Sequence, residues 1–247
     1  MRIVGVIPAR FASTRFPGKP LALIHGVTMI ERVYRQAKCA SKLSEVVVAT
    51  DDDRILQHVL GFGGLAVMTS ADHPSGTDRC AEVLRQAGQE WDAVINIQGD
   101  EPYIHPAQID HVASQLHVPG CQIATLIKPL ASIQEFLNVN VPKVVVGEHG
   151  HALYFSRQPI PYLAPEQIPV AIANQQLFRH IGIYGYQSQT LRAIASLQPV
   201  DLERMESLEQ LRWLYHGYSI NVGVTHLENH AVDVPEDVPR LEQIFKD

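Results

Sequence analysis

The stretch VGVIPARFASTRFPGKPL, Val4–Leu21, decides how this chain folds. It continues an apolar run from Ile3 that is typical of a buried strand, and the run breaks at Pro8. The loop that follows carries three cations among small residues, namely Arg10, Arg15 and Lys19. Backbone N–H groups and positive charge directly after a strand favour a polyphosphate ligand over a merely solvated connection. The loop matches neither the Walker A pattern nor G-x-G-x-x-G.

The first half of the chain alternates apolar runs with helical patterns. Strands are predicted at Ile3–Pro8, Glu45–Ala49, Leu65–Met68 and Ala93–Ile97. Helices are predicted over Thr28–Lys38, from a cap at Thr50 or Asp51 to about Leu60, and over Thr77–Gln86. Repeated units of this kind predict a doubly wound α/β fold, in which helices cover both faces of a mostly parallel sheet.

The second half is less regular. Its predicted strands are Ile123–Ile127, Lys143–Val146, Ala152–Ser156, Ile181–Tyr186 and a late strand through Val222, Val224 and Leu227. Four prolines disfavour a helix over Pro159–Ile172 and favour an irregular segment or a lid. Apolar residues at every third position predict one helix over Leu202–Tyr215, and Pro235–Phe245 is predicted as a closing helix. We therefore expect one continuous fold with an inserted substrate-binding portion.

Composition and charge exclude several classes of protein. The chain has 247 residues, of which 46% are hydrophobic and 19% charged, as is ordinary for a globular protein. The net charge of −6 argues against a face that binds nucleic acid. No apolar run approaches the ~20 residues of a membrane span, and no secretory signal is present. We therefore expect a cytoplasmic protein without a membrane or nucleic-acid partner.

Cysteine and histidine spacing adds no metal site. Cys39, Cys80 and Cys121 are far apart and form no C-x-x-C pair. They are expected to be buried free thiols in a reducing compartment. His149 and His151 flank Gly150 in a predicted turn and lack the spacing of metal ligands.

A carboxylate follows the strand at Ala93–Ile97, within Gln98-Gly99-Asp100-Glu101-Pro102. Ligands of open α/β sheets bind beyond the carboxyl ends of the strands, so Asp100 is expected beside a reacting phosphate. A carboxylate oxygen there suits Mg²⁺. The alternative is a turn residue that caps the next helix.

The loop Val4–Leu21 resembles the signature of the cytidylyltransferases that activate 3-deoxy-manno-octulosonate (KDO). Further segments resemble that family in the expected order and span nearly the whole chain: TSADHPSGTDR (Thr69–Arg79), INIQGDEP (Ile95–Pro102), ALYFSR (Ala152–Arg157), RHIGIYGY (Arg179–Tyr186), ESLEQLRWL (Glu206–Leu214) and VDVPEDV (Val232–Val238). The resemblance implies a three-layer α/β/α fold of the nucleotide-diphospho-sugar transferase type. It also implies a homodimer.

The resemblance implies the site residues as well. CTP would bind at Pro8, Ala9, Arg10, Ser13, Arg15, Lys19, Ser75, Gly76, Thr77, Arg79, Gln98 and Gly99. KDO would bind at Gln98, Arg157, His180, Tyr184, Glu209 and Gln210. Lys19, Asp100 and Asp233 would be catalytic, and the two aspartates would hold Mg²⁺. On the residues alone, Asp233 could equally begin the last helix. Val234 departs from the family, which more often has threonine there.

One domain, residues 1–247, is expected. Residues 1–128 would mainly bind CTP, residues 129–230 would bind the sugar acid and make dimer contacts, and residues 231–247 would form the closing helix. The implied reaction is transfer of CMP from CTP to the anomeric hydroxyl of KDO, with release of pyrophosphate, for lipopolysaccharide synthesis. Alternatives are a cytidylyltransferase for 8-amino-KDO, sialic acid or methylerythritol phosphate, and a nucleotide-binding module without activity.

Overall fold

The fold is described from a computed structural model, in which residues 1–88 and 90–246 are placed. The strands are β1 (Ile3–Ala9), β2 (Leu23–Ile24), β3 (Val27–Thr28), β4 (Glu45–Thr50), β5 (Ala66–Met68), β6 (Ala93–Asn96), β7 (Ile123–Pro129), β8 (Lys143–Val146), β9 (Ala152–Ser156), β10 (Phe178–Gln187) and β11 (Ile220–Val224). The helices are α1 (Met29–Lys38), α2 (Asp53–Gly61), α3 (Gly76–Gln86), α4 (Pro106–Gln115), α5 (Ile133–Leu137), α6 (Ile168–Ala173), α7 (Ser188–Ile194), α8 (Asp201–Glu206), α9 (Gln210–Tyr215), α10 (Asp237–Ile244) and a 3₁₀ turn, η1 (Lys19–Leu21).

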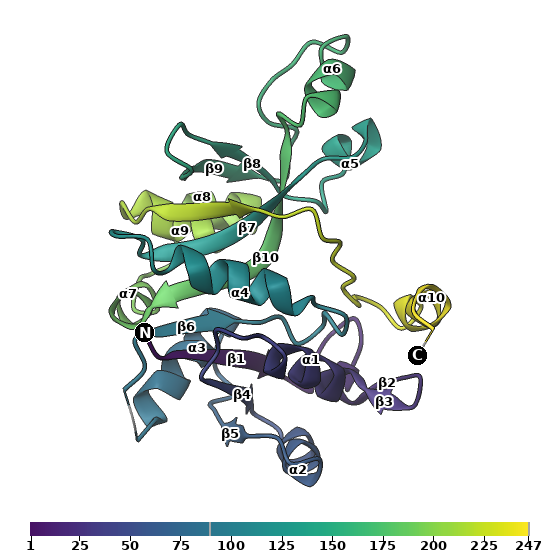
Figure 1. The fold of residues 1–247 in the computed structure, drawn as a ribbon, viewed down its shortest axis with the longest axis vertical. Coiled ribbons are helices and arrows are strands. Elements are labelled where there is room, and N and C mark those ends of the chain that lie inside the picture. The colour runs from purple at the N-terminus through teal and green to yellow at the C-terminus, as the bar shows by residue number, and fades with distance from the viewer. Residues whose placement is uncertain (89, 247) are drawn as a thin grey trace.

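A twisted sheet runs through the molecule in the strand order β11-β7-β10-β6-β1-β4-β5 (Figure 1). β1 lies between β4 and β6 and is parallel to both. β10 is antiparallel to its neighbours β6 and β7, whereas β11 is parallel to β7. The hairpin β8–β9 extends the sheet from β10. The predicted mostly parallel, doubly wound sheet is therefore confirmed, with one antiparallel strand inside it.

Helices cover both faces of the sheet, so the molecule has three layers. The buried side chains of α1, α2 and α4 form one core with one face of the sheet. Those of α3, α7 and α9 form a second core with the opposite face. Strands such as β1 are buried along nearly their whole length, as expected for a strand covered on both sides.

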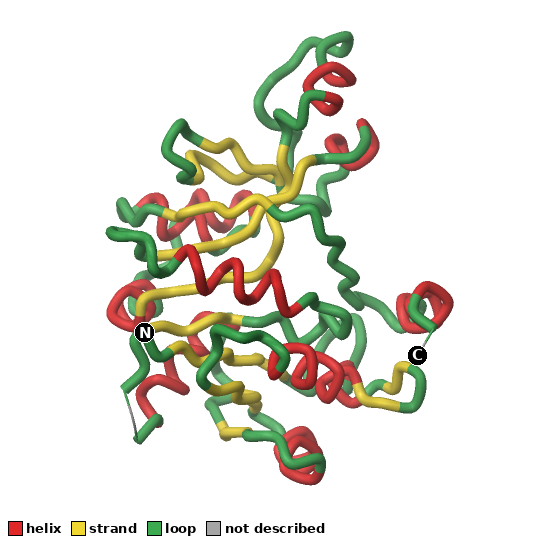
Figure 2. Tube along the Cα trace, viewed as in Figure 1, coloured by secondary structure: helices red, strands yellow, loops and turns green. Residues whose placement is uncertain are grey.

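The carboxyl ends of β1 and β6 lie at one edge of the sheet because these neighbouring strands are parallel. The loops that leave them begin at Arg10 and Ile97, and the loop after β5 leads into α3. The long connection from β11 to α10 also comes to this region (Figure 2). Four segments far apart in the sequence therefore meet where ligands of such sheets bind.

Several local predictions are wrong in detail. The helix predicted over Leu202–Tyr215 is two helices, α8 and α9, because Ser207 adopts a left-handed conformation (φ 52°) between them. The proline-rich Pro159–Ile172 includes the start of the short helix α6, with Pro169 in its first turn. There Pro169 is compatible with a helix, because the first N–H groups need no intrahelical partner.

Other corrections concern helix caps and burial. Asp52, and neither Thr50 nor Asp51, caps α2 by accepting a hydrogen bond from the N–H of Arg54. Cys39 is exposed at the end of α1, whereas Cys80 and Cys121 are buried as expected. Among the described residues, none of the helices has both the length and the apolar character that a membrane crossing requires.

Candidate active site

A pocket of about 260 Å³ opens at the carboxyl ends of β1 and β6. Its walls come from the loops after these strands and from the beginning of α3. The lining residues are Pro8, Ala9, Arg10, Ser13, Arg15, Lys19, Pro20, His73, Pro74, Ser75, Gly76, Arg79, Gln98, Gly99 and Asp100. Arginine and lysine side chains therefore surround a space that also receives one carboxylate.

The loop after β1 is closed on itself. The N–H groups of Ser13 and Gly18 both donate to the carbonyl of Phe11, each at 2.9 Å. Gly18 has a φ of 72°, a conformation that suits glycine, and directs the chain into η1. Arg10, Arg15 and Lys19 of this closed loop all line the pocket.

Lys19 joins the loop to two other segments. Its ammonium donates to Asp100 Oδ2 at 2.7 Å and to the carbonyl of Val232 at 2.8 Å. The N–H of Val232 in turn donates to the carbonyl of Asp100 at 2.9 Å. Asp233 follows directly and pairs with Arg15 at 2.8 Å. Two carboxylates separated by more than a hundred residues thus stand at the same cationic loop.

Gly99 and Gln98 shape the floor of the pocket. A Cβ at position 99 would lie 2.7 Å from the carbonyl oxygen of Pro8, so only glycine fits there. Gln98 donates its side-chain N–H to the carbonyl of Gly182 at 2.8 Å. This bond connects the pocket to β10, which carries His180 and Tyr184.

The amino end of α3 forms the opposite wall. Ser75 is the cap of this helix and accepts a hydrogen bond from the N–H of Asp78. The hydroxyls of Ser75 and Thr77 donate to the two carboxylate oxygens of Glu209, at 2.9 and 2.8 Å. Burial raises the pKa of Glu209, while the two hydroxyls and Arg212 act in the opposite direction. Glu209 therefore ties the second half of the chain to the pocket wall.

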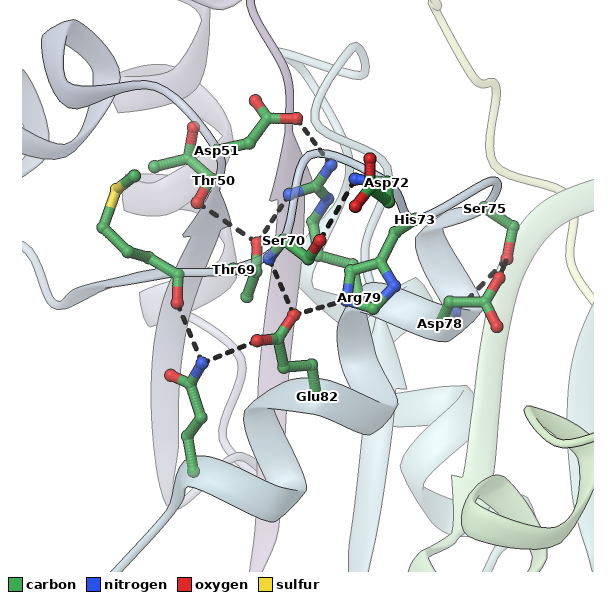
Figure 3. A network of polar contacts seen from close by, with 12 residues as sticks. Thr50, Asp51, Thr69, Ser70, Asp72, His73, Ser75, Asp78, Arg79 and Glu82 are labelled. Carbon is green, nitrogen blue, oxygen red and sulfur yellow. Dashed lines mark hydrogen bonds and ion pairs between the residues drawn. The ribbon is translucent and has the colours of Figure 1, made fainter.

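Arg79 also lines the pocket, and it is bonded to side chains of the segments after β4 and β5 (Figure 3). The residue is only 3% exposed, and its guanidinium donates to Thr69 Oγ1 at 2.5 Å and to Asp51 Oδ2 at 2.8 Å. One turn further along α3, Glu82 accepts from the N–H of Ser70 and contacts the imidazole of His73. Burial raises the pKa of Glu82, but these bonds outweigh it and the net pKa is lowered. The network fixes the loop 69–75 that carries His73 into the pocket.

Glu101 lies next to Asp100 but faces away from solvent, with 7% exposure. Its carboxylate accepts a hydrogen bond from Asn229 Nδ2 at 2.6 Å. Burial, with a smaller contribution from Asp100, raises the pKa of Glu101 to about 7, although Asn229 and Arg179 oppose the shift.

Apart from Gln98, the residues expected to bind the sugar acid are not part of the pocket lining: His180 and Tyr184 lie in β10, Glu209 and Gln210 at the start of α9, and Arg157 just after β9. The imidazole of His180 is 2.9 Å from Thr125 Oγ1, and burial lowers its pKa to about 3. Burial raises the pKa of Tyr184, because it disfavours the charged phenolate. The hydroxyl of Tyr184 and the side-chain N–H group of Gln210 are buried without a hydrogen-bond partner among the described residues. Unpartnered buried polar atoms are uncommon, and they suit a site that a polar ligand completes.

Arg157 is placed by backbone carbonyl groups. Its Nε donates to the carbonyl of Glu206 at 2.8 Å, and its terminal nitrogens donate to Val139 and Ser207 at 3.3 and 3.2 Å. Each terminal nitrogen carries a second N–H, so one side of the planar group remains able to donate to a carboxylate.

Residues 4–220 match the sequence profile of the cytidylyltransferase family. A 3-deoxy-manno-octulosonate cytidylyltransferase from Cytophaga hutchinsonii is 51% identical over 240 residues, which cover 97% of this chain and 96% of that protein. This chain belongs to the 3-deoxy-manno-octulosonate cytidylyltransferase family. The resemblance predicted from the motifs is therefore confirmed over the full length.

Solved structures agree with membership of this cytidylyltransferase family. A CMP:2-keto-3-deoxy-manno-octonic acid synthetase complexed with CTP superposes with a TM-score of 0.91 at 40% identity, covering 99% of this chain and 98% of that chain. A 4-diphosphocytidyl-2C-methyl-D-erythritol synthase from Anaerococcus prevotii has a TM-score of 0.65 at 10% identity, with coverage of 98% and 97%. The second likeness shows the shared fold alone.

The pocket of this cytidylyltransferase gathers most of the residues predicted for CTP. All of them line it except Thr77, which is buried behind the wall and bound to Glu209. Gln98 is the predicted sugar-acid residue that lines the pocket. Asp233, Arg157, His180, Tyr184, Glu209 and Gln210 are not among the lining residues.

The sequence prediction omitted three lining residues, Pro20, His73 and Pro74, and the buried Asp51 that holds Arg79. His73 and Pro74 lie inside Thr69–Arg79, one of the segments that resemble the family, so their position directly before Ser75 was the available signal. Nothing in the sequence around Asp51 pairs it with Arg79, because that contact joins separate βα units.

Proposed function

We propose that this protein transfers CMP from CTP to the anomeric hydroxyl of KDO, giving CMP-KDO and pyrophosphate. The observation that carries the proposal is the pocket at the ends of β1 and β6, where the cations Arg10, Arg15 and Lys19 stand beside the Asp100 carboxylate. Relatives named for this reaction match the chain over nearly its whole length. In this account the triphosphate lies along the cationic loop, and the cytosine lies against residues 75–79.

We further propose Mg²⁺ as the cofactor, held by Asp100 and Asp233. The donor set fits, because both groups are carboxylates, the hard oxygen ligands that Mg²⁺ prefers. Lys19 contacts Oδ2 of Asp100 and Arg15 contacts Oδ1 of Asp233, so the second oxygen of each carboxylate would be the metal ligand. Bound there, the metal would supply charge neutralisation at the α-phosphate and lower the pKa of the attacking hydroxyl.

The sugar acid is proposed to bind between the pocket and β10. Arg157 would pair with its carboxylate through two parallel N–H bonds. The unpartnered Tyr184 hydroxyl and Gln210 amide would bond its hydroxyl groups, which supports this position. Gln98 would contact both substrates, because it lines the pocket and is bonded to Gly182 of β10. His180 and Glu209 complete this group of residues.

The transfer then needs no covalent intermediate on the protein. The anomeric oxygen forms a bond to the α-phosphorus, and the bond from that phosphorus to the oxygen bridging to the β-phosphate breaks. The electron pair of the broken bond leaves with pyrophosphate, which also takes up, through water, the proton that the hydroxyl loses. The chain supplies orientation and charge. Lys19 and Arg15 compensate charge on the departing pyrophosphate, and Arg157 orients the acceptor for in-line attack.

We also propose the wider setting of the enzyme. Exposed apolar side chains on the second half of the chain, including Leu153, Tyr162 and Val170, support a homodimer formed through that half. Three free cysteines among the described residues support a reducing, cytoplasmic compartment. The product CMP-KDO would enter lipopolysaccharide synthesis. Residues 1–128 would mainly bind CTP, 129–230 the sugar acid and the partner subunit, and 231–247 would close the fold.

Pyrophosphate release from CTP tests the proposal. The assay would use KDO, 8-amino-KDO and sialic acid as acceptors, each with and without Mg²⁺. We expect release with KDO that depends on Mg²⁺, and no release with sialic acid. Activity with sialic acid and none with KDO would overturn the assigned acceptor, and binding of CTP without turnover of any acceptor would indicate a module without activity.

A further inference from the structure

Residues 225–233, here called the strap, connect β11 to the region before α10 (Figure 2). The strap is anchored at its beginning by the N–H of Thr225, which donates to the carbonyl of Ile127 at 2.8 Å. It is anchored at its end by Val232, which is fully buried in a small core with Ile24, Met29 and Leu241. Asp233, the proposed second metal ligand, is the last residue of the strap.

The middle of the strap is fixed by a relay of three side chains. Asn229 donates its Nδ2 to Glu101 Oε2 at 2.6 Å and accepts, at Oδ1, a bond from Gln108 Nε2 at 3.0 Å. Glu101 and Gln108 are 7% and 1% exposed. Gln108 lies in the first turn of α4, where its side-chain oxygen accepts from the N–H of His105. Both polar ends of Asn229 are therefore held by buried groups.

The same two consecutive residues, Asp100 and Glu101, hold the strap at two points. Asp100 accepts the N–H of Val232 through its carbonyl, and Glu101 accepts Asn229 through its side chain. Asp233 itself has a side chain that is 55% exposed, and its partner Arg15 is 66% exposed. An exposed ion pair constrains geometry little, whereas a buried hydrogen bond to a carboxylate constrains it strongly. The ion pair with Arg15 therefore does little to fix Asp233. Its backbone is held by the bond from its own N–H to Asp237 Oδ2 at 2.8 Å and by the tethers of the strap.

We propose that Glu101 is a positioning residue, which fixes Asn229 and thereby sets where Asp233 stands relative to Asp100. Glu101 touches neither substrate in this account. The inference rests on the proposed function only where turnover is measured. The tether itself is independent of the reaction.

The first test separates tethering from turnover. Hydrogen–deuterium exchange of a peptide covering residues 229–233 would be measured in wild type, Glu101→Ala and Glu101→Gln. We expect faster exchange in Glu101→Ala alone, because the glutamine oxygen still accepts from Asn229. Glu203→Ala is the matched control, since Glu203 is a largely buried carboxylate that is bonded to Arg212, away from the strap. Unchanged exchange in Glu101→Ala would overturn the proposal.

The second test links the tether to Asp233. Glu101→Ala should weaken Mn²⁺ binding to the protein without substrates, measured by electron paramagnetic resonance, and reduce kcat by about tenfold to a hundredfold, with a smaller change in KM for CTP. Glu101→Gln should restore both. In an Asp233→Asn background, Glu101→Ala should reduce kcat no further, because it acts through Asp233. An equal reduction in both backgrounds would contradict the proposal.

A second variant covers a failure of Glu101→Ala to fold. Asn229→Ala removes the same tether from a half-exposed position and should reproduce faster exchange and weaker Mn²⁺ binding. Normal exchange and Mn²⁺ binding in this variant would overturn the proposal. If wild type releases no pyrophosphate with any acceptor, the proposed function fails, whereas the exchange and Mn²⁺ measurements still decide the role of Glu101.

Discussion

Replacing Lys143 by methionine should destabilise the fold and impair the sugar-acid side of the site together. Lys143 is a fully buried lysine of β8. Its ammonium donates to the carbonyls of Asn138 at 2.9 Å, Val141 at 2.7 Å and Arg157 at 2.5 Å. Desolvation lowers its pKa. Methionine is unbranched like the aliphatic part of lysine, but it is one atom shorter and donates no hydrogen bond.

The expected loss in the free energy of unfolding follows from the carbonyl groups that lose the ammonium as their hydrogen-bond donor. The carbonyl of Asn138 keeps a second donor, the N–H of Val141 at 3.1 Å. The carbonyls of Val141 and Arg157 lose the ammonium, and each buried acceptor left unsatisfied costs about 1–3 kcal/mol. Burial of the methionine side chain offsets part of this, so we expect a loss of about 3 kcal/mol in the free energy of unfolding. For a chain of this size that corresponds to a fall of roughly 6–12 °C in Tm.

The assays are thermal unfolding and steady-state kinetics. Because Lys143 holds the carbonyl of Arg157, we expect KM for KDO to rise more than KM for CTP. Lys38→Met is the matched control, since Lys38 is exposed at the end of α1. A Tm for Lys143→Met that equals that of the control would refute the reasoning from unsatisfied carbonyls.

Three further outcomes are expected. Asp100→Ala or Asp233→Ala should reduce turnover by about a hundredfold or more while circular dichroism stays unchanged; near-normal turnover would remove these residues from the chemistry. His180, with a pKa near 3 when folded and about 6.5 when unfolded, should stabilise the protein fully above about pH 6.5 and progressively less as the pH falls toward 3. When the pH is lowered from 7.5 to 5.5, the free energy of unfolding, measured in urea, should therefore fall by about 1 kcal/mol less in His180→Gln than in wild type. An equal fall in both proteins would contradict the burial of a neutral imidazole. Arg79→Met should lower Tm because it leaves Asp51, whose side chain is only 14% exposed, without its cation. Adding Asp51→Asn to Arg79→Met should recover part of that loss, and no recovery would argue against the pair.

The first half of the fold could be predicted because its signals are local. Thr28–Lys38 has apolar residues at helical spacing, and the structure buries that stripe in α1. The run Glu45–Ala49 is continuous and becomes β4 beside β1. The helix predicted over Thr77–Gln86 becomes α3, which begins one residue earlier, at Gly76. In each case a single element of the sequence contains the information.

The break between α8 and α9 could not be predicted in this way. The leucine spacing continues through Ser207, so the pattern indicates one helix. The helix ends because Arg157 takes the carbonyls of Glu206 and Ser207, and Ser207 turns left-handed. That cause lies fifty residues away in the chain. Met205, which the spacing assigns to the apolar stripe, is consequently exposed.

The residues of the candidate site also differ in whether local sequence signals could predict their position. The cationic loop and Asp100 follow predicted strands, so their position at the sheet edge could be predicted from topology. Asp233 could not, because its place beside the loop depends on Val232, which is bonded to both Lys19 and Asp100. The resemblance to the family supplied Asp233, and the tethers of the strap give the physical reason for its position.

The central claim is that the anomeric oxygen of the sugar acid attacks the α-phosphorus of CTP. KDO labelled with ¹⁸O at the anomeric hydroxyl tests it directly, with short incubations and mass spectrometry of both products. The account predicts CMP-KDO that retains the label and pyrophosphate that carries none. Label in pyrophosphate, or CMP-KDO without label when the residual KDO is still labelled, would contradict it.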